Sequence, residues 1–252
     1  MKTAMKREAL HAYAQRLMNV GIEVTAQAHV ETGTKWAREP KVIALTLLCR
    51  TLGNMKGAVS LLNQRLLVEA QVLTRCCAEN LICMGALRQT GDAFVDELLR
   101  ADAASKKKQA GLVIEACSEG EVHAETVVRL GEVMKVIEAT HPKAKQLNTK
   151  DLSKRNPVGL TYVMFSVLSE QAVHVSTSSL GRHLGRDLQG GHAYLRVDIA
   201  PDPTEEQLVA LLLNLLGVVL GVIVGANELV GGTKPGHELR ALTDEFEAIR
   251  DE

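Results

Sequence analysis

The sequence predicts an all-α protein, a multi-helix bundle built around one apolar central helix at residues 205–229. Three observations support this prediction. Aromatic residues make up only 3% of the 252 residues, whereas β-sheet proteins are enriched in them. Helix-favouring residues such as Ala, Leu, Glu and Lys are abundant, and apolar residues recur with helical spacing through most of the chain. Residues 208–226 form an apolar run whose one polar side chain is Asn214, as expected for a helix buried on all sides.

The charge balance and the cysteines narrow the classes of function. Lys plus Arg number 29 and Asp plus Glu 30, so we expect no basic footprint for nucleic acid over the whole chain, although a local patch stays open. No CxxC pair occurs, and we interpret the cysteines as small buried residues in the reducing cytoplasm, without a metal or cofactor site. They are Cys49, Cys76, Cys77, Cys83 and Cys117. Residues 1–8 begin an amphipathic pattern, and no secretion signal is expected.

We expect a single helical domain over residues 1–252, with its elements set by helical spacing and by capping residues. The predicted helices are 4–31, 41–52, 55–88, 92–117, 118–140, 156–174, 180–188, 205–229 and 237–252. The first of these is expected at the periphery of the bundle, and the last is a charged tail helix.

Breaks and loops separate these helices. Gly53-Asn54 is expected to end the second helix, and the polar, locally basic residues 141–155 are expected to form a long loop. At most one short extended segment is predicted, near 194–199, where apolar and charged residues alternate. Because no second segment shows this alternation, we expect an extended connection and no sheet.

The apolar helix allows two interpretations. At about 1.5 Å per residue, residues 208–226 approach the thickness of a hydrocarbon core. Gly217, Gly221 and Gly225 lie on one face, as in membrane helix pairs. The run has no flanking Lys/Arg cluster and no Trp or Tyr belt, and Glu228 lies at one end. We therefore expect a buried core helix and no membrane; a membrane span is the alternative. The glycine face is expected to pack helices and to support a homo-oligomer.

A stripe of polar residues runs along the predicted helix 55–88, whose other faces are apolar. Its members are spaced four and three residues apart: Arg65, Glu69, Val72, Cys76, Glu79 and Cys83. Because unpaired buried charges are costly, Arg65 should pair with Glu69, and Arg75 with Glu79. The stripe is then either an ion-pair network that fixes helix register or a polar pocket inside the bundle. In either case, Glu79→Ala should destabilise the fold by leaving Arg75 buried without its partner.

The sixth predicted helix offers further polar partners for such a pocket. Tyr162 and His174 lie on it, and Glu170 and His174 are four residues apart, a weak form of the pairs that hold metals in helical bundles. His174 is otherwise interpreted as a satisfied histidine at a helix end. The predicted polar core cluster is Arg65, Glu69, Arg75, Glu79, Tyr162 and His174. We assign no catalytic residue and no metal site; Glu69, Glu79 and His174 are the candidates if the protein is an enzyme.

Two other motifs lack the context that their chemistry requires. The glycines of residues 181–186 follow no predicted strand, so they form no phosphate-binding loop. Lys106-Lys107-Lys108 is interpreted as a solvated helix face.

Two sequence blocks resemble a bacterial helical family catalogued as a domain of unknown function. The first is the run from Arg75 to Asn80, Arg-Cys-Cys-Ala-Glu-Asn, and the second is a Tyr, Leu-Ser and His pattern from Tyr162 to His174. The resemblance covers about residues 55–185. It implies an all-α fold and a polar cluster near Arg75, Glu79, Tyr162 and His174, and it implies no activity.

The chain is more distantly similar to HEPN-type helical bundles, which occur in bacterial toxins and phage-defence proteins. Their ribonuclease members carry an Arg followed, after four to six residues, by a His on a late helix. His174 has no Arg at that distance upstream. Arg186 and His192 meet the count, but Gly190-Gly191 lies between them and weakens the nuclease interpretation.

We therefore expect a non-enzymatic binding, regulatory or assembly protein that forms a homo-oligomer or binds a protein partner. The alternative is a HEPN-like ribonuclease or a metal-dependent hydrolase associated with toxin or phage-defence systems. The two hypotheses differ in geometry, because the enzyme needs Glu79 and His174 close together beside a cavity.

Overall fold

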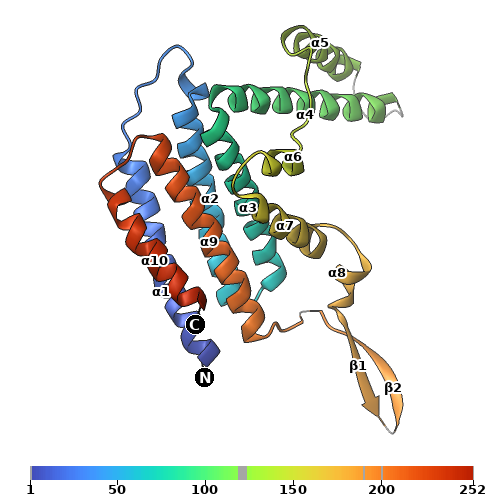
Figure 1. The fold of residues 1–252 in the computed structure, drawn as a ribbon. Helices are drawn as coiled ribbons and strands as arrows, with labels where there is room; N and C mark the ends of the chain where they lie inside the picture. Colours follow the sequence, from blue (N-terminus) through green and yellow to red (C-terminus); the bar gives the residue numbers. More distant parts are fainter. Residues whose placement is uncertain (1, 119–123, 190, 200, 252) are drawn as a thin grey trace.

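Four long helices form the body of the molecule (Figure 1). The computed structural model describes residues 2–118, 124–189, 191–199 and 201–251. The body consists of α1 (Lys2–Gln27), α2 (Pro40–Asn63), α3 (Leu67–Thr90) and α9 (Glu205–Leu229). Most buried apolar side chains of the core come from these helices. The predicted all-α fold is confirmed, with one small two-stranded sheet in addition.

Helix α1 belongs to this core and is not peripheral, contrary to the prediction. Leu10 and Leu17 have no exposed surface, and the hydroxyl of the equally buried Tyr13 donates a hydrogen bond to the carbonyl of Leu242 (3.0 Å). Leu242 lies on the tail helix α10 (Leu239–Asp251), which follows a short 3-10 turn, η3 (Pro235–Glu238), and packs on α1 and α9. The predicted tail helix is confirmed, and its apolar side completes the core.

Helix α9 lies at the centre of the bundle, as the sequence predicts. Its first turn is closed by a capping box: Thr204 Oγ1 accepts from the Gln207 backbone N–H, and Gln207 Oε1 accepts from that of Thr204. The helix contacts α1, α2, α3 and α10. Leu215, Val219 and Ile223 are fully buried as a result.

The glycine face of α9 is covered by the chain itself. A Cβ atom at Gly221 would lie 3.0 Å from Leu81 of α3, and one at Gly225 would lie 2.6 Å from Met84. Gly217 faces α10 in the same way. These glycines allow close helix packing within one chain, so this face is not open to a second copy, contrary to the expectation.

By length and composition, two of the described helices, α2 and α9, are able to cross a membrane. In α9, 67% of the most apolar window is buried inside the structure, against 33% in α2. The central helix of a soluble bundle has the same composition, so this property is weak evidence for a membrane.

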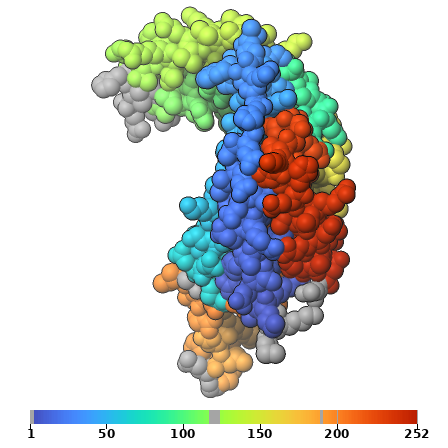
Figure 2. Space-filling view, turned by 90° about the vertical axis from the view of Figure 1, so that its left-hand side faces the viewer, coloured from blue at the N-terminus to red at the C-terminus, as the bar shows by residue number. Residues whose placement is uncertain are grey.

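At one end of the body, α4 (Asp92–Ser118) runs across the bundle, and α5 (Ala124–Thr140) packs along it (Figures 1 and 2). Gly91, with a φ of +49°, makes the sharp corner between α3 and α4. The predicted fourth and fifth helices are confirmed, except that the predicted start of the fifth lies outside the described residues.

A second layer of short elements packs on the side of α3. It comprises α6 (Thr149–Lys154), α7 (Gly159–Leu168), a π-helical turn called η2 (Ser169–Val173) and α8 (Thr177–Gly181). Helix α6 lies inside the segment 141–155 that was predicted to be a loop. Helix α8 begins with a reciprocal capping box formed by Ser176 and Ser179.

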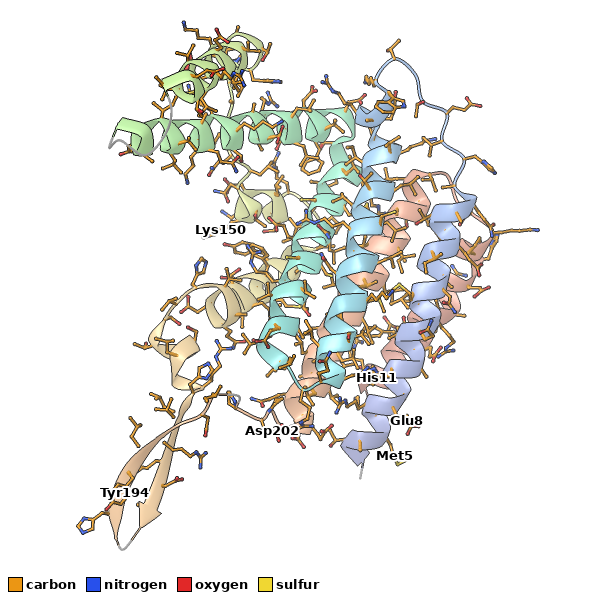
Figure 3. The ribbon with its side chains drawn as sticks, turned by 180° about the vertical axis from the view of Figure 1, so that it is seen from behind. Met5, Glu8, His11, Lys150, Tyr194 and Asp202 are labelled. Atoms are coloured by element: carbon orange, nitrogen blue, oxygen red, sulfur yellow. The ribbon has the colours of Figure 1, made fainter. Side chains whose placement is uncertain are left out.

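Strands β1 (Leu184–Gln189) and β2 (His192–Val197) form an antiparallel hairpin that projects from the body (Figures 1 and 3). Two predictions are therefore wrong. The predicted helix 180–188 does not form, because α8 ends at Gly181 and β1 follows it, and the segment predicted to be an unpaired connection near 194–199 belongs to a paired strand. Leu184 and Leu188 are four residues apart, a spacing that fits a helix and a strand alike. Gly191, with a φ of +82°, lies in the turn, where a left-handed backbone is typical of tight hairpins.

The break between α2 and α3 lies at residues 64–66 and not at Gly53-Asn54. Helix α2 continues through Gly53 because the buried neighbours Leu52 and Met55 offset the cost of about 1 kcal/mol for a glycine inside a helix. The true break contains Arg65, whose φ of +62° is rare for a residue other than glycine.

The cysteines are less buried than predicted. Among those described, Cys77 is buried, Cys76 and Cys83 are partly exposed, and Cys49 is exposed; the side chain of Cys117 lies outside the described residues. Removal from solvent raises the pKa of the Cys77 and Cys83 thiols to about 12. These two thiols stay protonated and unreactive at neutral pH.

Candidate functional site

Arg65 lies in the turn between α2 and α3, so it does not belong to the polar stripe of α3. Its Nε donates to Asp202 Oδ1 (2.6 Å), and its two Nη groups donate to Glu205 and to the carbonyl of Pro203. Figure 3 labels Asp202 at this place, near the start of α9. The predicted pair of Arg65 with Glu69 is wrong, because the turn directs Arg65 to these acceptors and leaves Glu69 exposed.

Two arginines hold Glu205 at the first turn of α9. Arg7 Nη1 lies 3.1 Å from Glu205 Oε2, and Arg7 Nη2 donates to the carbonyl of Leu62 (2.9 Å). Hydrogen bonds from Arg65 and then from Arg7 keep the pKa of Glu205 below its ordinary value of 4.5. This cluster ties α1, the α2–α3 turn and α9 together, which is a structural role.

Arg75 points from α3 toward α7, and its contacts fix it without using all of its donors. Its Nε donates to Ser169 Oγ (2.7 Å), and its guanidinium carbon lies 4.4 Å from the centre of the Phe165 ring. Its Nη1 is 3.8 Å from Glu79 Oε2, an ion pair too long for a hydrogen bond. The predicted Arg75–Glu79 pair is therefore present, although it is half-buried and not in the core.

The π-helical turn after α7 sets the direction of the polar residues that follow. The backbone N–H of His174 donates to the carbonyl of Ser169 (3.0 Å), five residues earlier. The chain leaves the helix at His174, whose backbone is extended. Their spacing predicted that Glu170 and His174 share one α-helical face. This prediction is wrong, because the π-helical turn separates them. Turns of this kind occur frequently at functional sites.

A surface groove of about 680 Å³ opens beside this turn, and we call it the Arg75 groove. It lies on the side of α3 covered by α7, the π-helical turn and α8. Its polar lining includes Arg75, Tyr162, Ser169, Glu170, Gln171, His174 and Ser178. The Tyr162 ring stacks on Phe165 (centroids 5.9 Å apart). Among the described residues, the side chains of Tyr162, Glu170 and His174 have no hydrogen-bond or ion-pair partner.

The structure brings together four of the six residues of the predicted cluster and separates the other two. Arg75, Tyr162 and His174 line the groove, and Glu79 pairs with Arg75. Arg65 and Glu69 lie beside a neighbouring hollow of about 820 Å³, toward the start of α9. The cluster is at the surface and not in the core, because apolar residues of α9 fill the interior on the opposite side of α3.

Phe165 and Ser169 were not predicted as site residues, although the sequence contains a signal for them. Tyr162, Phe165 and Ser169 are spaced three and four residues apart, so they share one helical face. Their meeting with Arg75 depends on how α7 packs against α3, which no local pattern reports.

The structure also buries polar residues in the core beside this motif, and Asn80 is one of them. It is 1% exposed, and its Nδ2 donates to Thr51 Oγ1 of α2 (2.9 Å). Asn80 ends the block that begins at Arg75. The block therefore serves two purposes, since one end lines the groove and the other joins α3 to α2.

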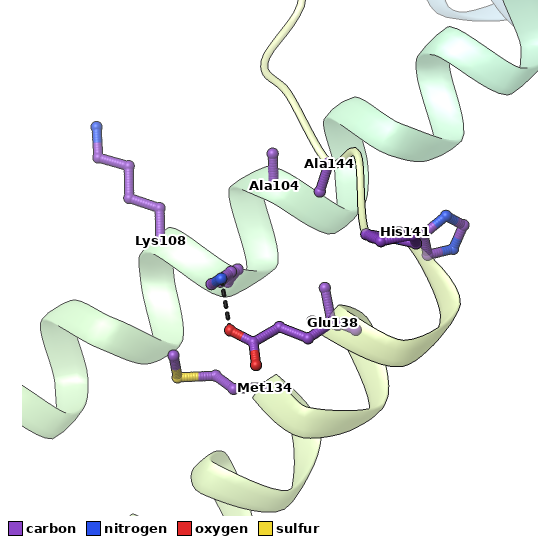
Figure 4. Close-up of a pocket in the computed structure, with 9 residues that line it drawn as sticks. Ala104, Lys108, Met134, Glu138, His141 and Ala144 are labelled. Atoms are coloured by element: carbon purple, nitrogen blue, oxygen red, sulfur yellow. Dashed lines mark hydrogen bonds and ion pairs between the residues drawn. The ribbon is translucent and has the colours of Figure 1, made fainter.

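A second hollow, of about 580 Å³, lies between α4 and α5 (Figure 4). Lys107 Nζ and Glu138 Oε1 form an ion pair across it (2.6 Å), and Lys108 and His141 lie at its edge. Lys106 pairs with Asp102 one turn away. The lysine run is thus an exposed helix face with two local ion pairs, in agreement with its interpretation from sequence.

No three His, Cys, Asp or Glu side chains of the described residues lie close enough together to hold a metal ion. No curated protein and no solved structure is similar enough to this chain to be matched. A family match does cover residues 41–192, more than half of the chain and both of the blocks that begin at Arg75 and Tyr162. The chain therefore belongs to the family described as "Family of unknown function (DUF5677)", and the predicted resemblance to such a family is confirmed.

Proposed function

We propose that this chain is a non-enzymatic cytoplasmic binding protein whose Arg75 groove takes an anionic group, a carboxylate or a phosphate. One observation supports this above all: Arg75 is fixed on one edge by Ser169 and on one face by Phe165, while its outer N–H groups have no close acceptor. A guanidinium oriented in this way presents a planar fork that matches carboxylate or phosphate oxygens.

The other lining residues complete the recognition site. The Tyr162 hydroxyl and the His174 ring offer further hydrogen bonds from the same groove, and their partners are supplied by the ligand. Glu170 places a negative charge at the edge of the same groove.

Isothermal titration of the full chain with inorganic phosphate, pyrophosphate, acetate and succinate tests this proposal and distinguishes phosphate from carboxylate. Arg75→Met should weaken binding about tenfold or more, since hydrogen bonds to charged groups contribute about 1.5–3 kcal/mol. Arg75→Lys should recover only part of the loss, because lysine keeps the charge without the fork.

Arg88→Met is the matched control. Arg88 lies on the same helix and pairs with Glu228 at an exposed site away from the groove. It should leave binding unchanged. Failure of the wild type to bind any of the four anions, or equal binding by Arg75→Met, would contradict the proposal.

A metal-independent ribonuclease is a second candidate, and one observation favours it. His174 lacks an upstream Arg at the spacing of HEPN nucleases, but Arg75 lies in the same groove in space. In such a site the histidine is able to move a proton and the arginine to stabilise phosphoryl charge.

Incubation with a labelled single-stranded RNA distinguishes the ribonuclease from the binding protein. Cleavage that disappears in His174→Ala supports the nuclease, and binding without cleavage supports the binding protein.

A further inference from the structure

The arm, which consists of β1, β2 and their turn (residues 184–197), has one apolar and one polar face. Residues opposite each other in an antiparallel pair share a face. Three opposite pairs make up the first face: Leu184 and Val197, Arg186 and Leu195, Leu188 and Ala193. Arg186 is the one charged residue among them. The other face holds the ion pair of Arg196 with Asp187 (3.0 Å).

Nothing in the described chain covers the apolar face. Leu188 is 71% exposed and Leu195 is 72% exposed, and Figure 3 shows Tyr194 of the same strand far from the bundle. A two-stranded hairpin is marginally stable by itself, and a contiguous exposed apolar surface marks a binding face. The arm therefore requires a partner surface.

Helix α7 carries a second uncovered apolar surface. Leu160 (86% exposed), Val163 and Val167 are spaced three and four residues apart and form a stripe on its outer side. The stripe ends at Glu170, which is exposed and, within the described residues, has no ion-pair or hydrogen-bond partner.

These two surfaces match in length and in charge. Leu184 to Leu188 spans about 13 Å of strand, and Leu160 to Glu170 spans about 15 Å of helix. In the part of the chain that the structure describes, the arm face carries one cation without a partner, Arg186, within an apolar surface, and the α7 stripe carries one anion without a partner. In a single chain the two surfaces do not meet, since both are exposed.

We propose that two copies of this chain form a two-fold dimer in which the apolar face of each arm packs on the α7 stripe of the other copy. Arg186 of one copy then pairs with Glu170 of the other. A second copy is the favoured occupant because each chain offers both complementary surfaces, and a two-fold axis uses each of them once and closes the assembly.

The available area is sufficient for such a dimer. The arm and the stripe, with Ile199 just beyond β2, expose eight aliphatic side chains: Leu160, Val163, Val167, Leu184, Leu188, Leu195, Val197 and Ile199. Each side chain exposes on the order of 100 Å² of apolar area. Together they approach the ~800 Å² that each partner buries in a stable interface.

The dimer also changes the Arg75 groove. Val167 and Glu170 belong both to the α7 stripe and to the groove lining. The arm of the second copy therefore forms one edge of the groove. The dimer itself does not depend on ligand binding, so its test is separate from that of the proposed function.

Sedimentation equilibrium and light scattering of the full chain test the inference. The wild type should be a dimer, and Leu195→Glu should be a monomer, because a charge enters the apolar face of the arm. Tyr194→Glu is the matched control on the opposite face of the same strand, and it should stay dimeric. Circular dichroism checks that each variant is folded, which is expected because the arm lies outside the core.

The charge pair gives a sharper test. Arg186→Glu and Glu170→Arg should each weaken the dimer about tenfold or more, and the double variant should recover most of the affinity. A wild type that stays monomeric at about 100 µM would overturn the inference. So would a dimer that survives Leu195→Glu, single charge variants without effect, or a double variant no better than the singles.

Discussion

Arg65 and Arg75 lie close in sequence, on either side of the start of α3, and they are used in opposite ways. Arg65 donates to two carboxylates and a carbonyl, and these contacts hold a left-handed backbone residue in place. Arg75 has one hydrogen bond, one aromatic contact and one long ion pair with Glu79, and it faces an open groove. The two arginines therefore differ in the number of satisfied donors, and the one with fewer is the one that we propose binds a ligand.

Burial alone does not distinguish the two. The Arg75 side chain is 23% exposed and the Arg65 side chain 36% exposed, so the more buried arginine is the one with donors to spare. The outer N–H groups of Arg75 face the open groove and are not buried. In the function that we propose, the ligand supplies their acceptor.

The largest effect should come from removing the satisfied arginine. Arg65→Met should lower the melting temperature by roughly 5 °C or more, because it leaves Asp202 and the Pro203 carbonyl without a donor. The unfavourable φ, present in the wild type as well, is then no longer offset by these contacts. Arg75→Met should lower it by less than about 2 °C. Thermal unfolding followed by circular dichroism measures both.

Arg65→Gly separates the two causes. Glycine adopts a positive φ without strain, so this variant should lie between the wild type and Arg65→Met. If Arg65→Gly were more stable than the wild type, the contacts of Arg65 would contribute little to stability. Arg65 would then have no structural role that distinguishes it from Arg75.

The same cluster should make stability depend on pH. The pKa of Glu205 is lowered in the folded state, chiefly by Arg65, so its charged form stabilises the fold above the unfolded value near 4.5, and this stabilisation is lost as the pH falls through the folded pKa. The difference in melting temperature between the wild type and Arg65→Met should therefore be full at pH 7 and shrink below about pH 4.5. A difference that stays constant down to pH 3 would contradict this.

The parts of the fold that follow from local pattern were predictable from the sequence. The apolar run of α9, its capping residues and the amphipathic tail helix are each determined within a few turns of chain. The turn at Arg65 was not predictable, because Gln64-Arg65-Leu66 contains neither Gly nor Pro, whereas Gly53 suggested a break that tertiary burial overrides.

The Arg75 groove was predictable only in part. The two family blocks named Arg75, Glu79, Tyr162 and His174, which the structure does bring together. The partners that fix Arg75 depend on the packing of α7 and on a π-helical turn, and neither has a periodic signature. The hairpin was missed because the spacing of Leu184 and Leu188 fits two periods.

A smaller effect is expected from the residue that orients Arg75. Ser169→Ala removes the acceptor of the Arg75 Nε and should cost about 0.5 kcal/mol of folding free energy. It should also weaken anion binding a few-fold, because Arg75 is no longer fixed on that edge. Ser166→Ala, three residues earlier on α7 and without a contact to Arg75, is the control and should change neither quantity. Equal affinity in Ser169→Ala and the wild type would show that Phe165 alone positions Arg75.

The smallest effect concerns Glu79, and here the structure reverses the expectation from sequence. From the sequence, Glu79→Ala was expected to destabilise the fold by leaving Arg75 buried and unpaired. In the structure Arg75 keeps Ser169 and Phe165, and Glu79 stands 3.8 Å away with a side chain 35% exposed. Half-exposed pairs of this kind contribute about 0.2–1 kcal/mol, so Glu79→Ala should lower the free energy of unfolding by less than about 0.5 kcal/mol.

Because Glu79→Ala also removes a negative charge beside Arg75, anion binding should become slightly tighter. If urea unfolding showed that Glu79→Ala loses more than about 2 kcal/mol of the free energy of unfolding, Arg75 and Glu79 would be a structural ion pair. Arg75 would then have the same kind of role as Arg65.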